Sequence, residues 1–380
     1  MTRALFVLCL ATLAWTWFGY ALAMRLRARW APRAIDAADW QPEIDIVVVV
    51  HDAARELQAR LANLDALDYP RDRLRLHVAS DGSEDGTAQV LRECADARLH
   101  AHLFARRRGK SACLGDVLPQ LTGEIVVFAD VRQRIEPGAL RALVRPLADP
   151  AVGAVGGALR FEAGADAAGV GAYWRHESAL RAAEGATGSV VGVSGALYAA
   201  RRALLPAVPA GLILDDLWIP LAIARGGARI AWAADAVAWD RPSADAALEA
   251  RRKRRTLAGN FQLIARDPSL LLPWKHPLGW RLWGHKWLRL AGPWLLGLLL
   301  LLNARLAIDG PRWRVLLVLH LAFYALALAP LAWPALARRR PLRLACTFVR
   351  MNGYVVLGLL DFLRGGTTHL WTVTREADAA

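Results

Sequence analysis

Cysteine is scarce in this sequence of 380 residues, and the few cysteines present form no pattern. The four of them, Cys9, Cys94, Cys113 and Cys346, are scattered without the spacing of a metal site or a disulfide framework. We therefore exclude a disulfide-stapled fold and a cysteine-ligated zinc module. Two of the four lie in the region that we expect to be soluble, which suits a reducing compartment. Internal repeats and low-complexity tracts are also missing from the sequence.

Acidic residues are fewer than basic ones, since 34 Asp and Glu stand against 48 Lys and Arg, which gives a formal net charge of +14. Such a charge can serve nucleic-acid binding, but no zinc-finger or RNA-binding signature accompanies it. The composition favours Arg-rich flanks of membrane helices instead, because 55% of the residues are hydrophobic and the mean hydropathy is +0.24. We therefore predict a soluble core joined to membrane segments, with no nucleic-acid partner.

Charge is absent from positions 4–23, "ALFVLCLATLAWTWFGYALA". About 20 apolar residues are enough to cross a bilayer as a helix. A cleaved signal peptide is the alternative, because "ALA" at 21–23 resembles a cleavage site. Basic residues follow at once, at Arg25, Arg27, Arg29 and Arg33. Since positive charge stays on the cytoplasmic side, we predict an uncleaved transmembrane helix over residues 1–24 with its N-terminus outside.

The C-terminal region, residues 275–380, is also membrane-like. Segments 288–308 and 315–337 are long apolar runs, and 344–363 is a weaker third run because charged residues interrupt it. Segment 277–290 mixes Trp, Leu and basic residues, so we expect an interfacial helix along the membrane surface; the alternative is the cytoplasmic flank of the next span. The sequence thus predicts two or three C-terminal spans.

Residues 40–265, between these ends, alternate between strand and helix patterns. "IDIVVVV" (44–50) and "LRLHVAS" (74–80) are predicted buried strands, and "ARELQARLANLDAL" (54–67) has helical apolar spacing. "EIVVFAD" (124–130) is a further strand. This alternation predicts an α/β fold, a doubly wound and mainly parallel sheet with helices on both faces.

Acidic residues stand where two of the predicted strands end. Asp81 ends the second strand in "ASDGSEDGT", and Asp130 ends "EIVVFAD". Parallel sheets of this kind bind ligands at the carboxyl ends of their strands, so we expect both acids at the ligand edge. The structural alternative for Asp81 is an Asp-Gly turn without a role in ligand binding.

Two further stretches complete the candidate site. Gly109 and Lys110, in "RRRGKSACLGD" (106–116), open a predicted helix, where backbone N–H groups and a cation can meet phosphate. An exposed basic loop is the alternative. Asp215 and Asp216, in "GLILDDLWIP", precede a helical apolar pattern. They suit an N-cap and a first-turn acid, or else a general base.

The order of these motifs resembles one known family. The chain is similar to the membrane-bound, inverting glycosyltransferases of family 2, which have the GT-A fold and are related to cellulose, hyaluronan and poly-N-acetylglucosamine synthases. The resemblance covers nearly the whole chain and predicts a cytoplasmic GT-A domain over residues 40–265. It is carried, in order, by "VVVVHDA", "LDYP", "SDGSEDGT", "RGKSACLGD", "FADVRQRIEPGAL", "GVSGALYAARR", "LDD", "RRKRRTLAGN", "HKWLRLAGP" and "MNGYVVLGLLDFLRG".

This resemblance implies a role for each matching residue. Asp130 would hold a divalent metal, Mg²⁺ or Mn²⁺, as the first acid of the family's Asp-x-Asp motif. Asp216 would be the base that deprotonates the acceptor hydroxyl, with Asp215 and Gly195 on the acceptor side. The implied reaction is a single displacement that inverts the anomeric carbon. The residues implied to bind the nucleotide-sugar are Asp81, Lys110, Asp130, Asp52 and Arg255.

The sequence departs from the family's pattern in three places. Arg132 replaces the second acid of Asp-x-Asp. Either one carboxylate then suffices at weaker affinity, because Mg²⁺ keeps waters and binds substrate phosphates, or Arg132 itself pairs with phosphate. Ala53 stands where an acid is expected, and Asp52 is the substitute. "RRKRRTLAGN" replaces the Gln-x-x-Arg-Trp motif of processive synthases, so Arg255 meets either the diphosphate or anionic lipid.

We therefore expect a membrane-bound glycosyltransferase that moves a sugar from a nucleotide-sugar, with a UDP-sugar as the expected donor, to a glycan or lipid-linked acceptor in polysaccharide synthesis. The expected location is the bacterial inner membrane with the catalytic domain in the cytoplasm, beside membrane lipid and other polysaccharide-synthesis proteins. The alternative is a catalytically impaired pseudo-enzyme that binds nucleotide and organises such a complex. Retention of Asp81, Asp130 and Asp216 favours the enzyme.

Overall fold

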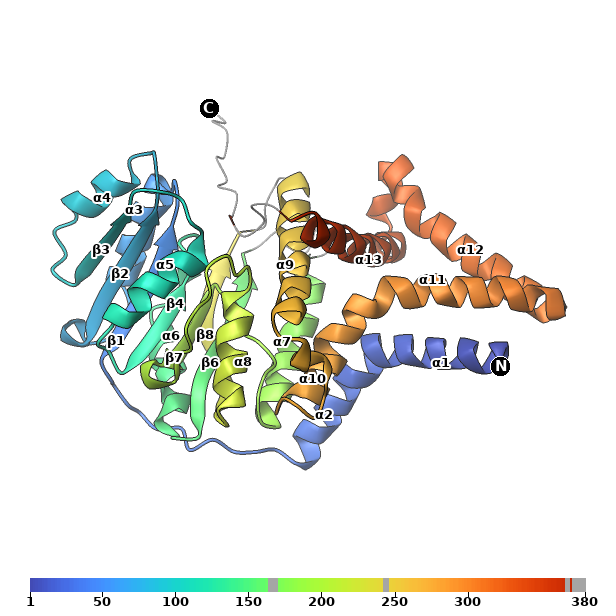
Figure 1. Ribbon diagram of the computed structural model, residues 1–380, viewed down its shortest axis with the longest axis horizontal. Helices are drawn as coiled ribbons and strands as arrows, with labels where there is room; N and C mark the ends of the chain where they lie inside the picture. Colours follow the sequence, from blue (N-terminus) through green and yellow to red (C-terminus); the bar gives the residue numbers. More distant parts are fainter. Residues whose placement is uncertain (163–169, 242–245, 366–369, 371–380) are drawn as a thin grey trace. The chain divides into compact units, whose positions relative to one another are not determined.

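The computed structural model describes residues 1–162, 170–241, 246–365 and 370. The chain divides into two compact units (Figure 1). The sheet unit is built from Arg27–Ala165 and Tyr173–Ser243, and the helical unit from Met1–Leu26 and Ala244–Arg364. The end of the predicted 275–380 region, at 366–369 and 371–380, lies outside the described residues.

An eight-stranded sheet forms the centre of the sheet unit, in the order β3-β2-β1-β4-β7-β6-β8-β5. β1 pairs in parallel with both β2 and β4, so the chain winds outward in two directions from β1. This confirms the predicted doubly wound, mainly parallel α/β fold. The strands are β1 (Ile44–Val50), β2 (Leu74–Asp81), β3 (Leu99–Phe104), β4 (Ile125–Ala129), β5 (Arg134–Ile135), β6 (Val152–Phe161), β7 (Leu197–Arg201) and β8 (Arg229–Asp240).

Helices cover both faces of this sheet (Figure 1). Alternate residues of β1, such as Ile46 and Val48, share one buried cluster with Leu57 of α3 and Leu140 of α6, because successive strand side chains point to opposite faces. α5 and α8 contact strands of the same sheet but contribute nothing to that cluster. The helices are α3 (Ala54–Asp65), α4 (Thr87–Glu93), α5 (Lys110–Val117), α6 (Ala139–Val144), α7 (Val170–Ala186) and α8 (Asp215–Arg225). Short 3₁₀ segments lie at Arg71–Arg73, Leu118–Gln120, Arg145–Ala148 and Arg202–Leu204.

One antiparallel strand decides where the site lies. β7 runs antiparallel to β4, with Leu197 opposite Ala129. The start of β7 therefore lies at the same sheet edge as the end of β4. This brings the residues just before Leu197 close to Asp130, although 65 positions separate Gly195 from Asp130 in the sequence.

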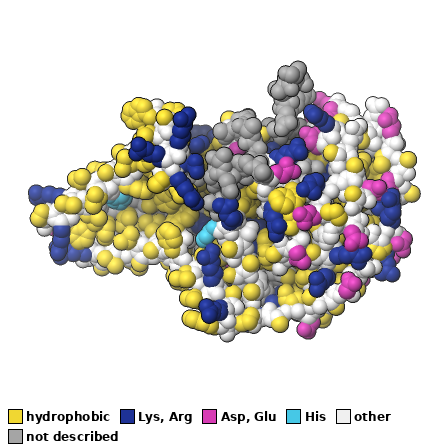
Figure 2. All heavy atoms as spheres, turned by 180° about the vertical axis from the view of Figure 1, so that it is seen from behind, with side chains coloured by type: hydrophobic (Ala, Val, Ile, Leu, Met, Phe, Trp, Pro, Cys, Tyr) yellow, Lys and Arg dark blue, Asp and Glu magenta, His cyan; other side chains and the backbone are white. Residues whose placement is uncertain are grey.

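Among the residues that the structure describes, four helical runs are long and apolar enough to cross a membrane, and all but the last four residues of the first run belong to the helical unit. They are Thr2–Trp30, Gly279–Asp309, Pro311–Ala332 and Arg340–Arg364. On the face drawn in Figure 2, hydrophobic side chains dominate this unit, whereas Asp and Glu gather over the sheet unit. The elements are α1 (Thr2–Ala14), a π-helical turn (Trp15–Gly19), α2 (Tyr20–Trp30), α9 (Ala246–Arg266), a 3₁₀ turn (Pro268–Leu271), α10 (Gly279–Leu282), a second π-helical turn (Trp283–Trp287), α11 (Leu288–Leu306), 3₁₀ turns at Ala307–Asp309 and Pro334–Arg338, α12 (Pro311–Ala332) and α13 (Arg340–Arg364).

Three boundaries differ from those expected from the sequence. The first helical run continues to Trp30, beyond the predicted end at residue 24. The segment 277–290, expected as a separate interfacial helix, runs without a break into α11, because nothing between α10 and α11 interrupts the helical backbone. α9, which we assigned to the domain 40–265, groups with the helical unit. There Arg254 forms a two-pronged ion pair with Asp361 of α13, at 2.9 and 2.5 Å.

Candidate active site

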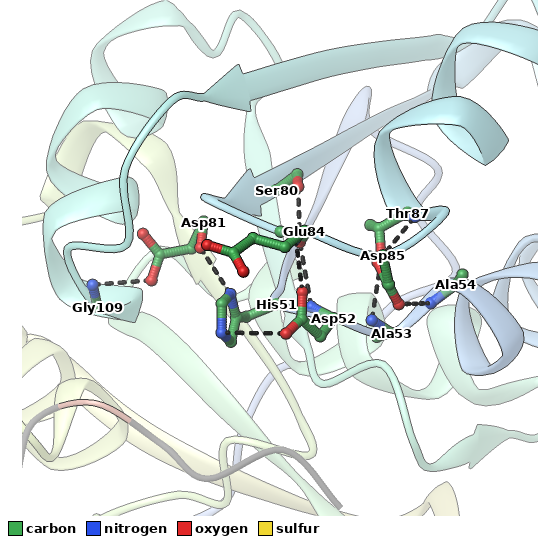
Figure 3. A network of polar contacts seen from close by, with 11 residues as sticks. His51, Asp52, Ala53, Ala54, Ser80, Asp81, Glu84, Asp85, Thr87 and Gly109 are labelled. Carbon is green, nitrogen blue, oxygen red and sulfur yellow. Dashed lines mark hydrogen bonds and ion pairs between the residues drawn. The ribbon is translucent and has the colours of Figure 1, made fainter. Parts of the chain in front are cut away.

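Two turns at the ends of β1 and β2 are held together by polar contacts (Figure 3). His51 Nδ1 lies 2.8 Å from the carbonyl oxygen of Asp81, so this nitrogen carries the proton and donates. Asp52 adopts a left-handed backbone with φ of 45°, and its carboxylate accepts from the N–H of Glu84 at 2.8 Å. Ala53 N–H donates to Thr87 Oγ1 at 2.9 Å. Asp52, predicted to contact the donor, is thus placed where it stabilises a turn.

Asp81 is fully buried, and its carboxylate accepts two backbone hydrogen bonds from the loop before α5. Arg108 N–H donates at 2.7 Å and Gly109 N–H at 2.8 Å. Gly82 permits this approach, because a Cβ there would lie 2.3 Å from the backbone nitrogen of Arg107. The structure therefore gives Asp81 a positioning role, since it fixes the loop that delivers Lys110. Its predicted contact with the nucleotide-sugar stays a prediction.

Lys110 lies among three carboxylates at the carboxyl edge of the sheet. Its Nζ is 3.0 Å from Asp130 Oδ1 and 3.4 Å from Asp215 Oδ2. Asp216 completes the group, and the N–H of Gly195 donates to Asp216 Oδ2 at 3.0 Å. We call Asp130, Asp215 and Asp216 the acid cluster. These acids, Lys110 and Gly195 were all predicted site residues, and the fold brings them together from four different chain segments.

Gly195 stands at the centre of this group. A Cβ at this position would lie 3.5 Å from Asp216 Oδ2, 3.6 Å from Lys110 Nζ and 3.7 Å from Asp130 Oδ2. The absence of a side chain therefore keeps open the space onto which three charged groups converge.

The acid cluster sets the protonation of its neighbours. Burial alone would lower the pKa of Lys110, but the negative charges of Asp130 and Asp215 raise it above its ordinary value, so Lys110 stays an ammonium. Burial, and then the charges of Asp215, Asp216 and Asp130, raise the pKa of Tyr198. Tyr198 is fully buried, its ring is stacked on Phe128 with centroids 4.4 Å apart, and its hydroxyl has no hydrogen-bond partner among the described residues. It is a neutral polar group close to the cluster.

Arg132, which one of our two expectations pairs with phosphate, forms an ion pair with an acid of β8, and its contact with phosphate stays a prediction. Its Nη2 lies 2.6 Å from Asp240 Oδ2, and Gln133 Nε2 donates to the same oxygen at 3.1 Å. Asp240 is 5% exposed, and a buried carboxylate needs a cation and hydrogen-bond donors. Arg132 thus compensates the negative charge of Asp240 at the end of β8.

Sequence reasoning missed the residues that hold the Asp130 loop. Arg60 of α3 is 2% exposed and donates to the backbone carbonyls of Asp130, Val131 and Gln133, with Nε at 3.2 Å from the Val131 oxygen. Asn63, one turn further along α3, exchanges two hydrogen bonds of 2.8 Å with the backbone of Ile135. An arginine on an amphipathic helix is usually solvated, so no signal in the sequence distinguished Arg60 from its neighbours.

The oxygen donors at this edge fit a divalent ion only in part. Within the described residues, no group of three His, Cys, Asp or Glu side chains is arranged to hold a metal. The Asp130 side chain is 43% exposed, and one of its oxygens faces Lys110. Mg²⁺ and Mn²⁺ prefer oxygen ligands, and Mg²⁺ takes several of them from water and substrate phosphates. One carboxylate is therefore compatible with an ion that arrives with a diphosphate.

Arg255 lies on α9 in the helical unit, whereas all the other predicted site residues lie in the sheet unit. Its contact with a diphosphate or with anionic lipid stays a prediction.

A family model described as "Glycosyltransferase like family 2" matches residues 42–259, which is more than half of the chain. The structure is similar to the mannosyltransferase PcManGT from Pyrobaculum calidifontis in complex with GDP-Man and Mn²⁺. That similarity covers 96% of this chain and 99% of the other, with a TM-score of 0.70 and 26% sequence identity.

Curated relatives match shorter stretches. An N-acetylglucosaminyltransferase of Rhizobium leguminosarum bv. viciae is 29% identical over 129 residues, which is 33% of this chain and 30% of the relative. A beta-monoglucosyldiacylglycerol synthase of Synechocystis sp. is 28% identical over 118 residues, which is 30% of this chain and 25% of the relative. The chain thus spans less than a third of the length of these two relatives.

Proposed function

We propose that this chain, which belongs to glycosyltransferase family 2, transfers a sugar from a nucleoside-diphosphate sugar to an acceptor hydroxyl by a single inverting displacement. The observation that supports this most is the convergence of Lys110 and the acid cluster on the open space at Gly195. Doubly wound sheets bind their ligands at this edge. The family match over residues 42–259 makes the chain a glycosyltransferase.

Asp216 is the general base in this proposal. It is half-buried, whereas its neighbour Asp215 is only 5% exposed, and the N–H of Gly195 orients its carboxylate. Asp216 takes the proton of the acceptor hydroxyl as that oxygen bonds to the anomeric carbon. The bond from the anomeric carbon to the diphosphate oxygen breaks at the same time, and its electron pair leaves with the diphosphate.

In this proposal Lys110 and Asp130 help to stabilise the diphosphate leaving group. The Lys110 ammonium is held at this edge by its ion pair with Asp130, so it can offset negative charge that develops on the diphosphate. A divalent ion held by Asp130 would supply further positive charge at the same place. Asp81 contributes by fixing the loop from which α5 and Lys110 start.

The donor and acceptor follow from different observations. The family resemblance in the sequence favours a UDP-sugar, whereas the similar mannosyltransferase carries GDP-Man, so both nucleotides are to be compared. The four apolar helical runs favour a membrane location, which suits a lipid-linked acceptor or a growing glycan. We propose the bacterial inner membrane, with the sheet unit in the cytoplasm and a role in polysaccharide synthesis.

The test is turnover of UDP-, GDP- and dTDP-sugars by the purified full chain, with Mg²⁺, Mn²⁺ or a chelator, and with lipid and glycan acceptors. We expect one nucleotide to be released, and Asp216→Asn to lose turnover while it still binds that nucleotide. Asp235→Asn is the matched control, because Asp235 is an exposed acid of β8 outside the site. Nucleotide binding without turnover of any donor would favour the pseudo-enzyme, and undiminished turnover in Asp216→Asn would contradict the base assignment.

A further inference from the structure

The chain between α9 and α11 exposes an unusual set of apolar side chains. Within ten residues, Leu271 is 38% exposed, Leu272 39%, Trp274 70% and Trp280 73%. Single exposed apolar residues are common on soluble proteins and need no explanation. Four of them in ten residues, two of which are tryptophans, indicate a surface that something apolar covers. We call residues 271–280 the tryptophan loop.

The tryptophan loop is a built structure with an inner and an outer side. Its backbone accepts a hydrogen bond from the indole of Trp283 at the Leu271 carbonyl, at 2.9 Å. The indole of Trp287 likewise donates to the carbonyl of Leu270, just before the loop, at 3.0 Å. On the inner side, Leu270 and Leu278 are buried.

Gly279 closes the loop tightly. A Cβ at this position would lie 2.2 Å from the carbonyl oxygen of Pro273, so only glycine allows this approach. Gly279 N–H also donates to the His276 carbonyl at 2.8 Å. The exposure of Trp274 and Trp280 is therefore fixed by the loop's own geometry.

We propose that the outer side of the tryptophan loop inserts into the interfacial layer of a lipid bilayer. The loop passes directly into the helical run Gly279–Asp309, which is long and apolar enough to span the membrane. A residue at the start of such a span lies at the depth of the headgroups. Tryptophan is enriched at that depth, because its apolar ring and polar N–H suit opposite sides of the boundary.

The charges near the loop agree with this depth. Lys275 is exposed beside Trp274, and Arg281 follows Trp280. Long basic side chains bury their stems in apolar surroundings while their charges reach the headgroups. This inference rests on the proposed membrane location but not on sugar transfer.

The experiment measures the depth of single labelled positions in the full chain reconstituted into liposomes with anionic lipid. In a Cys94→Ser background, where the three remaining cysteines are buried, Trp274→Cys and Trp280→Cys each receive a nitroxide label. The rates at which the nitroxide collides with oxygen and with a water-soluble nickel complex report how deeply it lies in the bilayer. Leu204→Cys in the sheet unit is the aqueous control, and Leu319→Cys within α12 is the deep control; both side chains are exposed, at 41% and 61%.

We expect the nickel accessibility at 274 and 280 to be several-fold below that at 204, with oxygen accessibility between those of 204 and 319. The proposal would be overturned if the nickel accessibility at 274 and 280 equalled that at 204. It would also be overturned if both labels lay as deep in the bilayer as the label at 319. Protection of the labelled positions, together with disulfide cross-linking of two copies of the unlabelled Trp274→Cys or Trp280→Cys variant under oxidising conditions, would make the loop a protein interface instead. If 319 itself is aqueous, the membrane location is wrong, and the loop proposal is overturned with it.

As a check with the native indoles, lipids brominated near the headgroup should quench the fluorescence of the unlabelled chain. The double variant Trp274→Phe/Trp280→Phe should lose part of that quenching. An unchanged quenched fraction would place both indoles outside the interface.

Discussion

Replacing Arg60 by alanine tests how strongly one buried side chain holds the Asp130 loop. Arg60 donates to the carbonyls of Asp130, Val131 and Gln133. Burial lowers its pKa to about 10, with the charge of Asp130 acting against this, so the guanidinium is charged at neutral pH. A buried carbonyl that loses its donor costs about 1–3 kcal/mol. Three of them would cost roughly 3–9 kcal/mol if no water replaced the guanidinium.

Water will enter part of the space that the Arg60 side chain leaves, so we expect a loss of about 3–5 kcal/mol in the stability of the sheet unit. For a unit of about 200 residues this corresponds to a fall of roughly 10 °C in the unfolding midpoint. Any folded variant should also bind nucleotide more weakly, because the carbonyls that lose their donor belong to the loop that carries Asp130.

The assay is thermal unfolding of the full chain in detergent, with nucleotide binding measured on the same samples. Arg55→Ala is the matched control, because Arg55 lies on the same helix and is exposed, and surface substitutions usually change stability by less than about 0.5 kcal/mol. Arg60→Lys keeps the positive charge but loses the forked guanidinium, so its unfolding midpoint should lie between those of Arg60→Ala and Arg55→Ala. Equal midpoints for Arg60→Ala and Arg55→Ala would refute the reasoning.

Two further predictions concern glycines and histidines. Gly195→Ala should keep the fold, because its Cβ would make ordinary contacts of 3.5 Å or more. It should nevertheless lose most of the sugar-transfer activity, because the methyl group fills the space at the acid cluster. Gly82→Ala should instead lower the unfolding midpoint, because its Cβ would lie 2.3 Å from a backbone nitrogen. A fully active Gly195→Ala would show that the space is not used. Burial, and then His77, lower the pKa of both His100 and His102, so the unfolded chain binds more protons. Stability should therefore fall as the pH drops through about 6.5, and His100→Gln/His102→Gln should flatten that slope in midpoints measured against pH.

The sequence predicted the first half of the sheet to within a residue or two. β1, β2 and β4 are runs of Val, Ile and Leu that end at the ligand edge, and such patterns are strong. β6, "VGAVGGALRF", and β8, "RIAWAADAVAWD", were not assigned, because Gly and Ala have low strand propensity. Their conformation depends on pairing with each other along nine positions, which is a tertiary effect.

The candidate site was predictable in its members but not in their partners. Lys110, Asp130 and Asp216 stand in recognisable motifs at strand ends and helix starts. Which carboxylate each cation meets depends on chain crossings that no local pattern records. Arg132 pairs with Asp240, 108 positions away, and Arg60 reaches a loop about 70 positions away. Asp52 and Asp81 were expected at the ligand, but their carboxylates are used by backbone N–H groups of nearby turns.

The charge balance at Gly195 has a consequence for the order of binding. The acid cluster places three carboxylates around the Lys110 ammonium, at the place where we propose that an anionic diphosphate binds. Donor and cation should therefore bind as linked ligands, each raising the affinity for the other by the same factor, as thermodynamic reciprocity requires. Neither should bind tightly alone. Substrate selection would then begin with the charge of the incoming complex, before any contact with the sugar.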